Sequence, residues 1–226
     1  MSELFSIQLQ NRQQQGRDGV WLDLPTTTEQ VQAALRQIGI SSDNPQGLFI
    51  SGYFAEEEKR FAIPYNMVLA SNVDELNFLA SRLETLSTGE RTELNAALQA
   101  PQSELFSIGR ITDFPENVDY YVHLPDVHGP AQLGDYYLNR SGMVDMPEEW
   151  KGGIDTAQFG RYVAQQEQGV FTEYGYLVKS GDEWQKVHEG QPVPEEYRVL
   201  SFPAPEVLRD AANIPPPVQP ETEPQK

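Results

Sequence analysis

The six-residue stretch SELFSI occurs twice in this chain, at residues 2–7 and 103–108. An internal repeat would imply a duplicated fold, so the sequences that flank the two copies decide how the chain is divided. The first copy continues with alternating apolar and polar residues, which is typical of a strand. The second follows a helix end closed by Pro101, and its Ser107 is suited to cap a helix. The flanks share only a later Leu-Pro step, so we expect two different local structures and no duplicated domain.

Charge limits the partners of this chain. The 226 residues include 34 acidic and 16 basic side chains, which gives a formal net charge of -18. The imbalance is greatest in residues 102–226, which carry 21 of the acids and nine of the bases. Nucleic-acid binders place clustered Lys and Arg against phosphates, so we expect no nucleic-acid partner, whereas a basic protein partner remains open.

Cysteine and long apolar runs are both missing from the sequence. Without cysteine the chain forms neither disulfides nor thiolate metal sites. No apolar run approaches the roughly 18 residues of a membrane span, and the N-terminus lacks the basic and apolar pattern of a secretion signal. We therefore expect a cytoplasmic protein with no membrane partner.

The order of elements predicts an α+β fold in three pieces with a tail. Residues 1–65 are predicted to form a small α+β domain from the strand-like stretches SELFSIQLQ, GVWLDLP and GLFISGYF, with a helix between the second and third. Residues 66–101 are predicted to form a short helical domain, and residues 102–190 a second α+β domain. Proline becomes frequent after about residue 190, which predicts a partly disordered tail over residues 191–226.

Helix and hairpin boundaries follow from capping and turn residues. Within residues 102–190, helices are predicted over 130–142 and 155–169, the second ending at Gly169 as its C-cap. The stretch VFTEYGYLVKSGDEWQKVHEG then alternates and turns at SGDE, residues 180–183, which predicts a hairpin. The helices nearer the N-terminus are predicted to follow the caps Thr27, Asn72 and Ser87.

Metal-capable side chains gather in the stretch HLPDVH, which holds His123, Asp126 and His128. Only one further histidine exists, and spacing alone does not supply a coordination geometry. The sequence lacks G-x-S-x-G, Walker, G-x-G-x-x-G and H-E-x-x-H motifs. We expect no metal, no cofactor and no catalytic residues, and a hydrolase built on these three side chains stays as an alternative.

A family resemblance rests on motifs that occur in order over roughly residues 5–178. VWLDLP near the N-terminus is followed by LASNVDELNFLASRLETLSTGERTELNAAL, and then by LGDYYLNRSG (residues 133–142) and IDTAQFGRYV (residues 154–163). This series resembles the ArdA family of antirestriction proteins. The last two motifs are similar to the family's tyrosine-bearing helix and its Y-x-x-x-G-R helix, with Phe159 to Arg161 retained here.

The resemblance implies a function as well as a shape. It implies an elongated, three-domain homodimer that imitates bent B-form DNA and occupies the DNA groove of type I restriction-modification enzymes, on the methyltransferase core. Such proteins act in the cytoplasm of a bacterial host that carries a plasmid, transposon or phage. The alternative is an acidic adaptor of a mobile element that binds another basic DNA-binding protein.

Carboxylates supply a physical reason for mimicry. Duplex DNA carries about one charge per 1.7 Å of axis, and carboxylates three or four residues apart on a helix lie about 5 to 6 Å apart. Acids kept only for solubility are the plain alternative. The acids predicted to take the place of phosphates are Asp74, Glu75, Glu84, Glu90, Glu93, Glu104, Asp113, Glu116, Asp119, Asp126, Asp135, Asp145, Glu148, Glu149 and Asp155.

Aromatic side chains in residues 102–190 predict self-association. The LGDYYLNRSG motif and the predicted hairpin carry more aromatic residues than a small isolated domain needs. We expect a two-fold dimer through this domain, with Tyr136, Tyr137 and Tyr174 at the contact.

Overall fold

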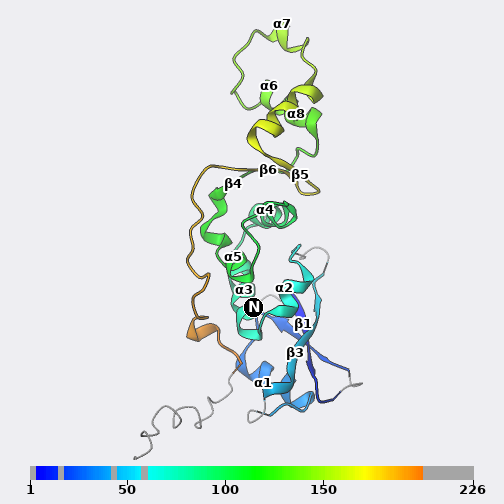
Figure 1. The fold of residues 1–226 in the computed structure, drawn as a ribbon, viewed down its shortest axis with the longest axis vertical. Coiled ribbons are helices and arrows are strands. Elements are labelled where there is room, and N and C mark those ends of the chain that lie inside the picture. The colour runs from blue at the N-terminus through cyan, green and yellow to red at the C-terminus, as the bar shows by residue number, and fades with distance from the viewer. Residues whose placement is uncertain (1–3, 15–17, 42–44, 57–60, 201–226) are drawn as a thin grey trace, which may run out of the picture.

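A computed structural model describes residues 4–14, 18–41, 45–56 and 61–200 of the chain. These residues form the predicted mixture of helices and strands, with two small antiparallel sheets. Figure 1 shows an elongated molecule with the first sheet near one end and α6, α7 and α8 at the other. In chain order the elements are β1 (Phe5–Asn11), β2 (Val20–Leu24), α1 (Thr28–Gln37), β3 (Leu48–Phe54), α2 (Tyr65–Ala70), α3 (Val73–Glu84), α4 (Thr88–Gln99), α5 (Ile108–Thr112), β4 (Tyr121–Leu124), α6 (Pro130–Asn139), α7 (Glu148–Lys151), α8 (Thr156–Glu167), β5 (Val170–Thr172) and β6 (Gly175–Lys179).

The two SELFSI copies lie in different structures, as predicted. The first enters β1, the central strand of the sheet ordered β2-β1-β3. The second crosses an irregular segment and ends at the first residue of α5, where the Ser107 side chain accepts a hydrogen bond from the Arg110 N–H at 3.3 Å. Non-local packing therefore decides the structure of this hexapeptide.

Helix starts follow the predicted caps. Thr27, Asn72 and Ser87 are the N-caps of α1, α3 and α4, and each forms a complete capping box with the residue three positions later. The box uses glutamine in α1 and glutamate in α3 and α4. Each box satisfies two backbone N–H groups that the helix itself leaves free.

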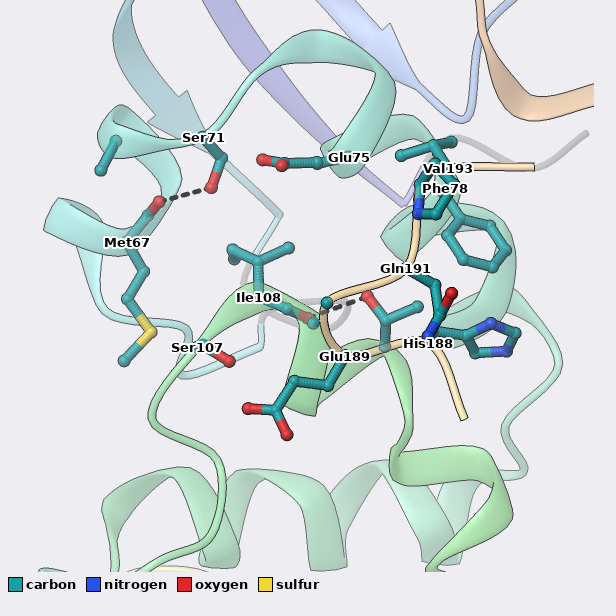
Figure 2. Close-up of a pocket in the computed structure, with 15 residues that line it drawn as sticks. Met67, Ser71, Glu75, Phe78, Ser107, Ile108, His188, Glu189, Gln191 and Val193 are labelled. Atoms are coloured by element: carbon teal, nitrogen blue, oxygen red, sulfur yellow. Dashed lines mark hydrogen bonds between the residues drawn. The ribbon is translucent and has the colours of Figure 1, made fainter. Parts of the chain in front are cut away.

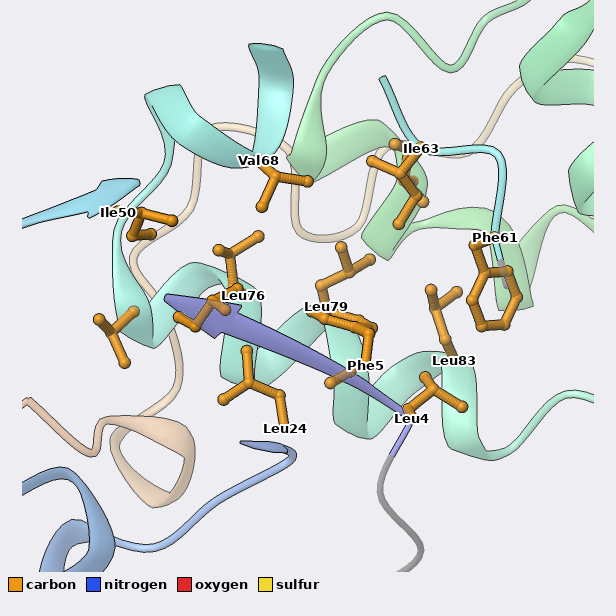
Figure 3. Close-up of a cluster of buried hydrophobic side chains, with 14 of the residues drawn as sticks. Leu4, Phe5, Leu24, Ile50, Phe61, Ile63, Val68, Leu76, Leu79 and Leu83 are labelled. Atoms are coloured by element: carbon orange, nitrogen blue, oxygen red, sulfur yellow. The ribbon is translucent and has the colours of Figure 1, made fainter. Parts of the chain in front are cut away.

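One apolar core runs through most of the elongated molecule. It joins Leu9 of β1, Leu79 of α3 and Leu94 of α4, and it continues to Leu177 of β6. Figure 3 shows β1 running beside α3, with Phe5 of β1 near Leu79 of α3. The core crosses residues 65 and 101, where domain boundaries were predicted, so the division into domains stays a prediction.

The second sheet separates this core from a smaller one. Its order is β4-β6-β5. Successive residues of a strand face opposite sides of a sheet, and in β6 Leu177 joins the main core whereas Tyr176 packs with Val127 and Leu133. The β5–β6 hairpin turns at residues 173–174. The predicted turn at residues 180–183 was wrong, because the chain there leaves the sheet instead of reversing.

Helices α6 and α8 cross at a pair of glycines at the far end of the molecule. A Cβ on Gly134 would overlap the carbonyl oxygen of Thr156, and a Cβ on Gly160 would overlap that of Pro130. The end of α8 differs from the prediction, since Gln168 and not Gly169 has the left-handed conformation, with φ 57°. A side chain at Gly169 would overlap the ring of Tyr176, so close packing explains this glycine.

Residues 180–200, here named the return segment, run back along the molecule from the second sheet toward the first (Figure 1). The Asn117 side chain exchanges hydrogen bonds with Gln185 of this segment at 2.7 and 2.9 Å. Farther along, the Asn77 side chain donates to the Tyr197 carbonyl at 3.0 Å, and Val199 is buried in the main core. Residues 191–200 of the predicted, partly disordered tail pack on α3, and residues 201–226 lie outside the described residues.

Candidate functional site

Two of the acids predicted to face a partner hold the return segment. Asp113 is fully buried, and its carboxylate accepts from the N–H groups of His188 at 2.6 Å and Glu189 at 3.2 Å. Asp74 Oδ1 accepts from the N–H groups of Val199 at 2.8 Å and Leu200 at 2.7 Å. A buried carboxylate that accepts backbone N–H bonds is a structural anchor. Asp113 is closed off from any partner, and Asp74 is half-buried and engaged.

Four of the predicted acids belong to ion pairs within the chain. Glu104 accepts from Lys179 Nζ at 2.9 Å and Arg110 Nη1 at 2.7 Å. The hydrogen bond from Lys179 is the main reason that the pKa of Glu104 lies below its usual value. Two more pairs join Glu116 to Arg82, and Asp135 to Arg140. The fourth of these acids, Glu148, is exposed and pairs with Lys151 at 2.6 Å.

Glu93 on α4 differs from the other carboxylates. One of its oxygens is buried and has no hydrogen-bond partner among the described residues. Burial, followed by repulsion from Glu90 and Asp119, raises the pKa of Glu93 to about 8. Glu93 is therefore mostly uncharged at neutral pH and does not resemble a phosphate there. Glu93 is one of the acids predicted to take the place of phosphates, and its buried, unpaired oxygen does not favour that role.

Helix capping engages three further acids of the predicted series. Glu75 and Glu90 close the boxes at the starts of α3 and α4. The bonds to Ser87 lower the pKa of Glu90, so this carboxylate stays ionised. Asp155 is the N-cap of α8, where its Oδ1 accepts from Ala157 and Gln158 N–H groups at 2.9 and 3.0 Å. Glu84 is half-buried near the end of α3.

The exposed acids form a smaller set that includes residues the sequence did not single out. Four exposed carboxylates lie on the return segment, which the fold brings back along the other elements. The sequence analysis did not include these four acids, because residues 180–200 were predicted to be a turn and a tail. Nothing in the sequence showed that this segment runs back along the other elements. From the predicted series, the exposed members are Asp119, Asp126, Asp145, Glu148, Glu149 and Asp155, and the return segment adds Asp182, Glu183, Glu195 and Glu196.

The metal-capable residues are not brought together. His123 Nε2 lies 2.8 Å from the carbonyl oxygen of Tyr174, in the second sheet. Asp126 and His128 are exposed in the loop between β4 and α6. Within the part of the chain that the structure describes, no group of three or more His, Asp or Glu side chains is placed to hold a metal ion. No described helix is long and apolar enough to cross a membrane.

Tyrosines of the α6–α8 end have partners inside the chain. Tyr137 and Tyr176 both donate to the Glu167 carboxylate, at 2.5 and 3.0 Å. Burial and these bonds to an anion raise the pKa of both phenols. Tyr136 packs edge-on against Tyr137, and Tyr174 packs against the main core. The large apolar side chains most exposed at this end are Met143, Trp150 and Tyr162.

These features define an elongated, acidic α+β protein that carries a long series of exposed carboxylates in the second half of its chain. A family model described as antirestriction protein (ArdA) matches residues 15–178. Because the match covers well over half of the sequence, the chain belongs to the ArdA family of antirestriction proteins, which are inhibitors and not enzymes. A comparison with curated protein sequences found no significant match. The family match ends just before the return segment begins.

Proposed function

We propose that this antirestriction protein is an acidic mimic of B-form DNA that occupies the DNA-binding groove of a type I restriction-modification enzyme, on its methyltransferase core. The observation that carries the proposal is the spread of exposed carboxylates over an elongated fold, from Asp119 to the α7 end and onto the return segment. A DNA groove is lined by basic side chains that contact successive phosphates. A long acidic surface offers such a groove many weak contacts at once.

Electrostatics gives the proposal its expected signature. Each exposed ion pair contributes only about 0.2 to 1 kcal/mol, so tight binding requires many pairs. Contacts between exposed charges are screened by salt. The affinity for the enzyme should therefore fall steeply as salt is added, and the protein itself should not bind DNA.

Self-association is the second part of the proposal. Met143 and Trp150 are 76% and 66% exposed, and Tyr162 on α8 is 60% exposed. Exposed aromatic and methionine side chains are typical of interface centres. We propose a two-fold homodimer through the α6–α8 end, with Tyr136 and these three side chains nearer the contact than Tyr137, which is engaged by Glu167.

A restriction assay in cells tests the function. Phage plating or plasmid transfer into a host with a type I system should be restored when the protein is expressed, and should not change in a host that lacks the system. Gel shifts with the purified protein and duplex DNA should show no complex at physiological salt. Direct DNA binding would contradict the mimic. Equal competition against unrelated DNA-binding proteins would favour the acidic adaptor over the mimic.

A further inference from the structure

A cavity of about 760 Å³ lies between α2, α3, α5 and the return segment. Its walls come from segments far apart in the sequence, and the return segment closes one side with residues 188–193. Figure 2 shows Ile108 between the side chains of Glu75 and Glu189, with Met67 at one side and Phe78 at the other. The cavity thus exists only because the return segment is anchored on the rest of the fold.

The lining is largely apolar, with Met67, Phe78, Ile108 and Val193 contributing side chains. A pocket of this size and lining is suited to an alkyl chain or an apolar side chain. The Phe78 side chain is already packed, since its ring contacts those of His188 and Tyr197 with centroid distances of 5.0 and 4.7 Å. Space for a ligand therefore lies on the Met67 and Ile108 side.

The charge of the lining is negative. Glu75 and Glu189 are the ionisable acids among the lining residues, and none of these residues is Lys or Arg. Glu75 Oε2 accepts the N–H of Asn72 at 3.2 Å, which leaves Oε1 available. Ser71 donates its hydroxyl proton to the Met67 carbonyl at 2.8 Å, so its oxygen can accept another hydrogen bond. Glu189 at the rim is paired with Arg110 at 3.0 Å and with Lys186 at 3.5 Å, so Glu75 carries the available negative charge.

We propose that this cavity binds a basic, apolar element of the partner protein, namely an arginine or lysine side chain that follows its alkyl stem over Ile108 and Met67 and places its charge at Glu75. This occupant rests on the proposed function, which requires a basic partner. Charge complementarity selects it, because Glu75 Oε1 is available to a cation and would repel an anion, whereas Glu189 is already paired with Arg110 and Lys186. The cavity then gives one localised contact beside the many weak ones of the acidic surface.

The test uses the full chain and three probes that each contain a six-carbon chain. Hexylguanidinium, hexanol and hexanoate are titrated into isotope-labelled protein, and the amide signals of Gly109 and Gly190, which line the cavity, are followed by NMR. Hexylguanidinium should shift these signals in a saturable way. Hexanol should bind several-fold more weakly, and hexanoate at least tenfold more weakly.

Two pairs of variants match each change with a control. Glu75→Gln removes the charge and keeps the capping box, since α1 uses Gln30 at the same position, and it should weaken hexylguanidinium binding about fivefold. Glu90→Gln makes the same change in α4, away from the cavity, and should leave binding unchanged. Ala70→Lys places a cation at the cavity and should abolish probe binding, whereas Asn66→Lys on the same helix should not.

The outcomes separate this inference from the proposed function. Equal binding of hexanoate and hexylguanidinium, or equal effects of Glu75→Gln and Glu90→Gln, would overturn the cavity proposal. Signals of the cavity that move with protein concentration alone would identify a second copy as the occupant and would also overturn it. Protection against restriction without probe binding refutes the cavity alone, and probe binding without protection refutes the antirestriction mechanism alone.

Discussion

Replacing Glu93 by glutamine should stabilise the protein, and the gain should grow with pH. The unfolded chain releases the Glu93 proton near the ordinary glutamate pKa of 4.5, whereas the folded chain holds it until about 8. Because the folded state binds the proton more tightly, this group's effect on stability becomes more unfavourable as pH rises through that window. Glutamine does not titrate, so the variant does not lose stability through this group as pH rises.

The magnitude follows from the environment of Glu93. Each unit of pKa corresponds to about 1.4 kcal/mol, but the side chain is only partly buried, and solvent screening reduces the cost. Glu93→Gln should raise the free energy of unfolding above that of the wild type. This increase should be larger at pH 8.5 than at pH 5 by about 1 to 3 kcal/mol.

Urea unfolding at pH 5, 7 and 8.5 measures this difference. Asp145→Asn, which removes one exposed carboxylate, controls for the loss of a negative charge. The free energy of unfolding of Asp145→Asn should stay within about 0.5 kcal/mol of the wild-type value at each pH. An equal effect of Glu93→Gln at pH 5 and pH 8.5 would refute the assignment of a retained proton to Glu93.

Three further predictions concern the return segment, the helix crossing and the oligomer. Asp113→Ala should lower the free energy of unfolding by about 2 to 4 kcal/mol, because it removes a buried carboxylate and leaves two partly buried N–H groups unpaired. The exposed Asp126→Ala should have almost no effect in the same urea titration. Gly160→Ala should destabilise by about 1 to 3 kcal/mol through overlap with α6, whereas Gly89→Ala in open space on α4 should stabilise by up to about 1 kcal/mol. Light scattering at micromolar concentration should give a dimer, and a monomer there would contradict the proposed α6–α8 contact.

Local features were predictable from the sequence. The caps Thr27, Asn72 and Ser87 and the apolar periodicity after them depend on neighbours within one helical turn. The strands of the first sheet were predicted because they alternate over several residues. The ArdA resemblance was predictable because its motifs are retained in order, and the family match confirms it.

The return segment was not predictable, and this explains the errors in the candidate site. Its bonds run from backbone N–H groups of a proline-rich stretch to Asp74 and Asp113, more than 70 residues earlier, so no local pattern marks them. Side-chain burial likewise depends on contacts between segments far apart in the sequence, so the burial of Glu93 and Asp113 could not be predicted. Asp182 and Glu195 were overlooked for the same reason.

The central claim is that many exposed carboxylates take the place of DNA phosphates. The most direct measurement is displacement of a labelled DNA duplex from a purified type I methyltransferase core by the wild type, by four single variants and by their combination. The four positions are exposed and lie outside the described ion pairs: Asp119→Asn, Asp126→Asn, Asp145→Asn and Glu149→Gln. Each single change should weaken displacement by about fivefold or less, and the combination by at least about fourfold, at about 0.2 to 1 kcal/mol for each charge. A single variant that abolishes displacement while staying folded, or a combination that matches the wild type, would contradict the account.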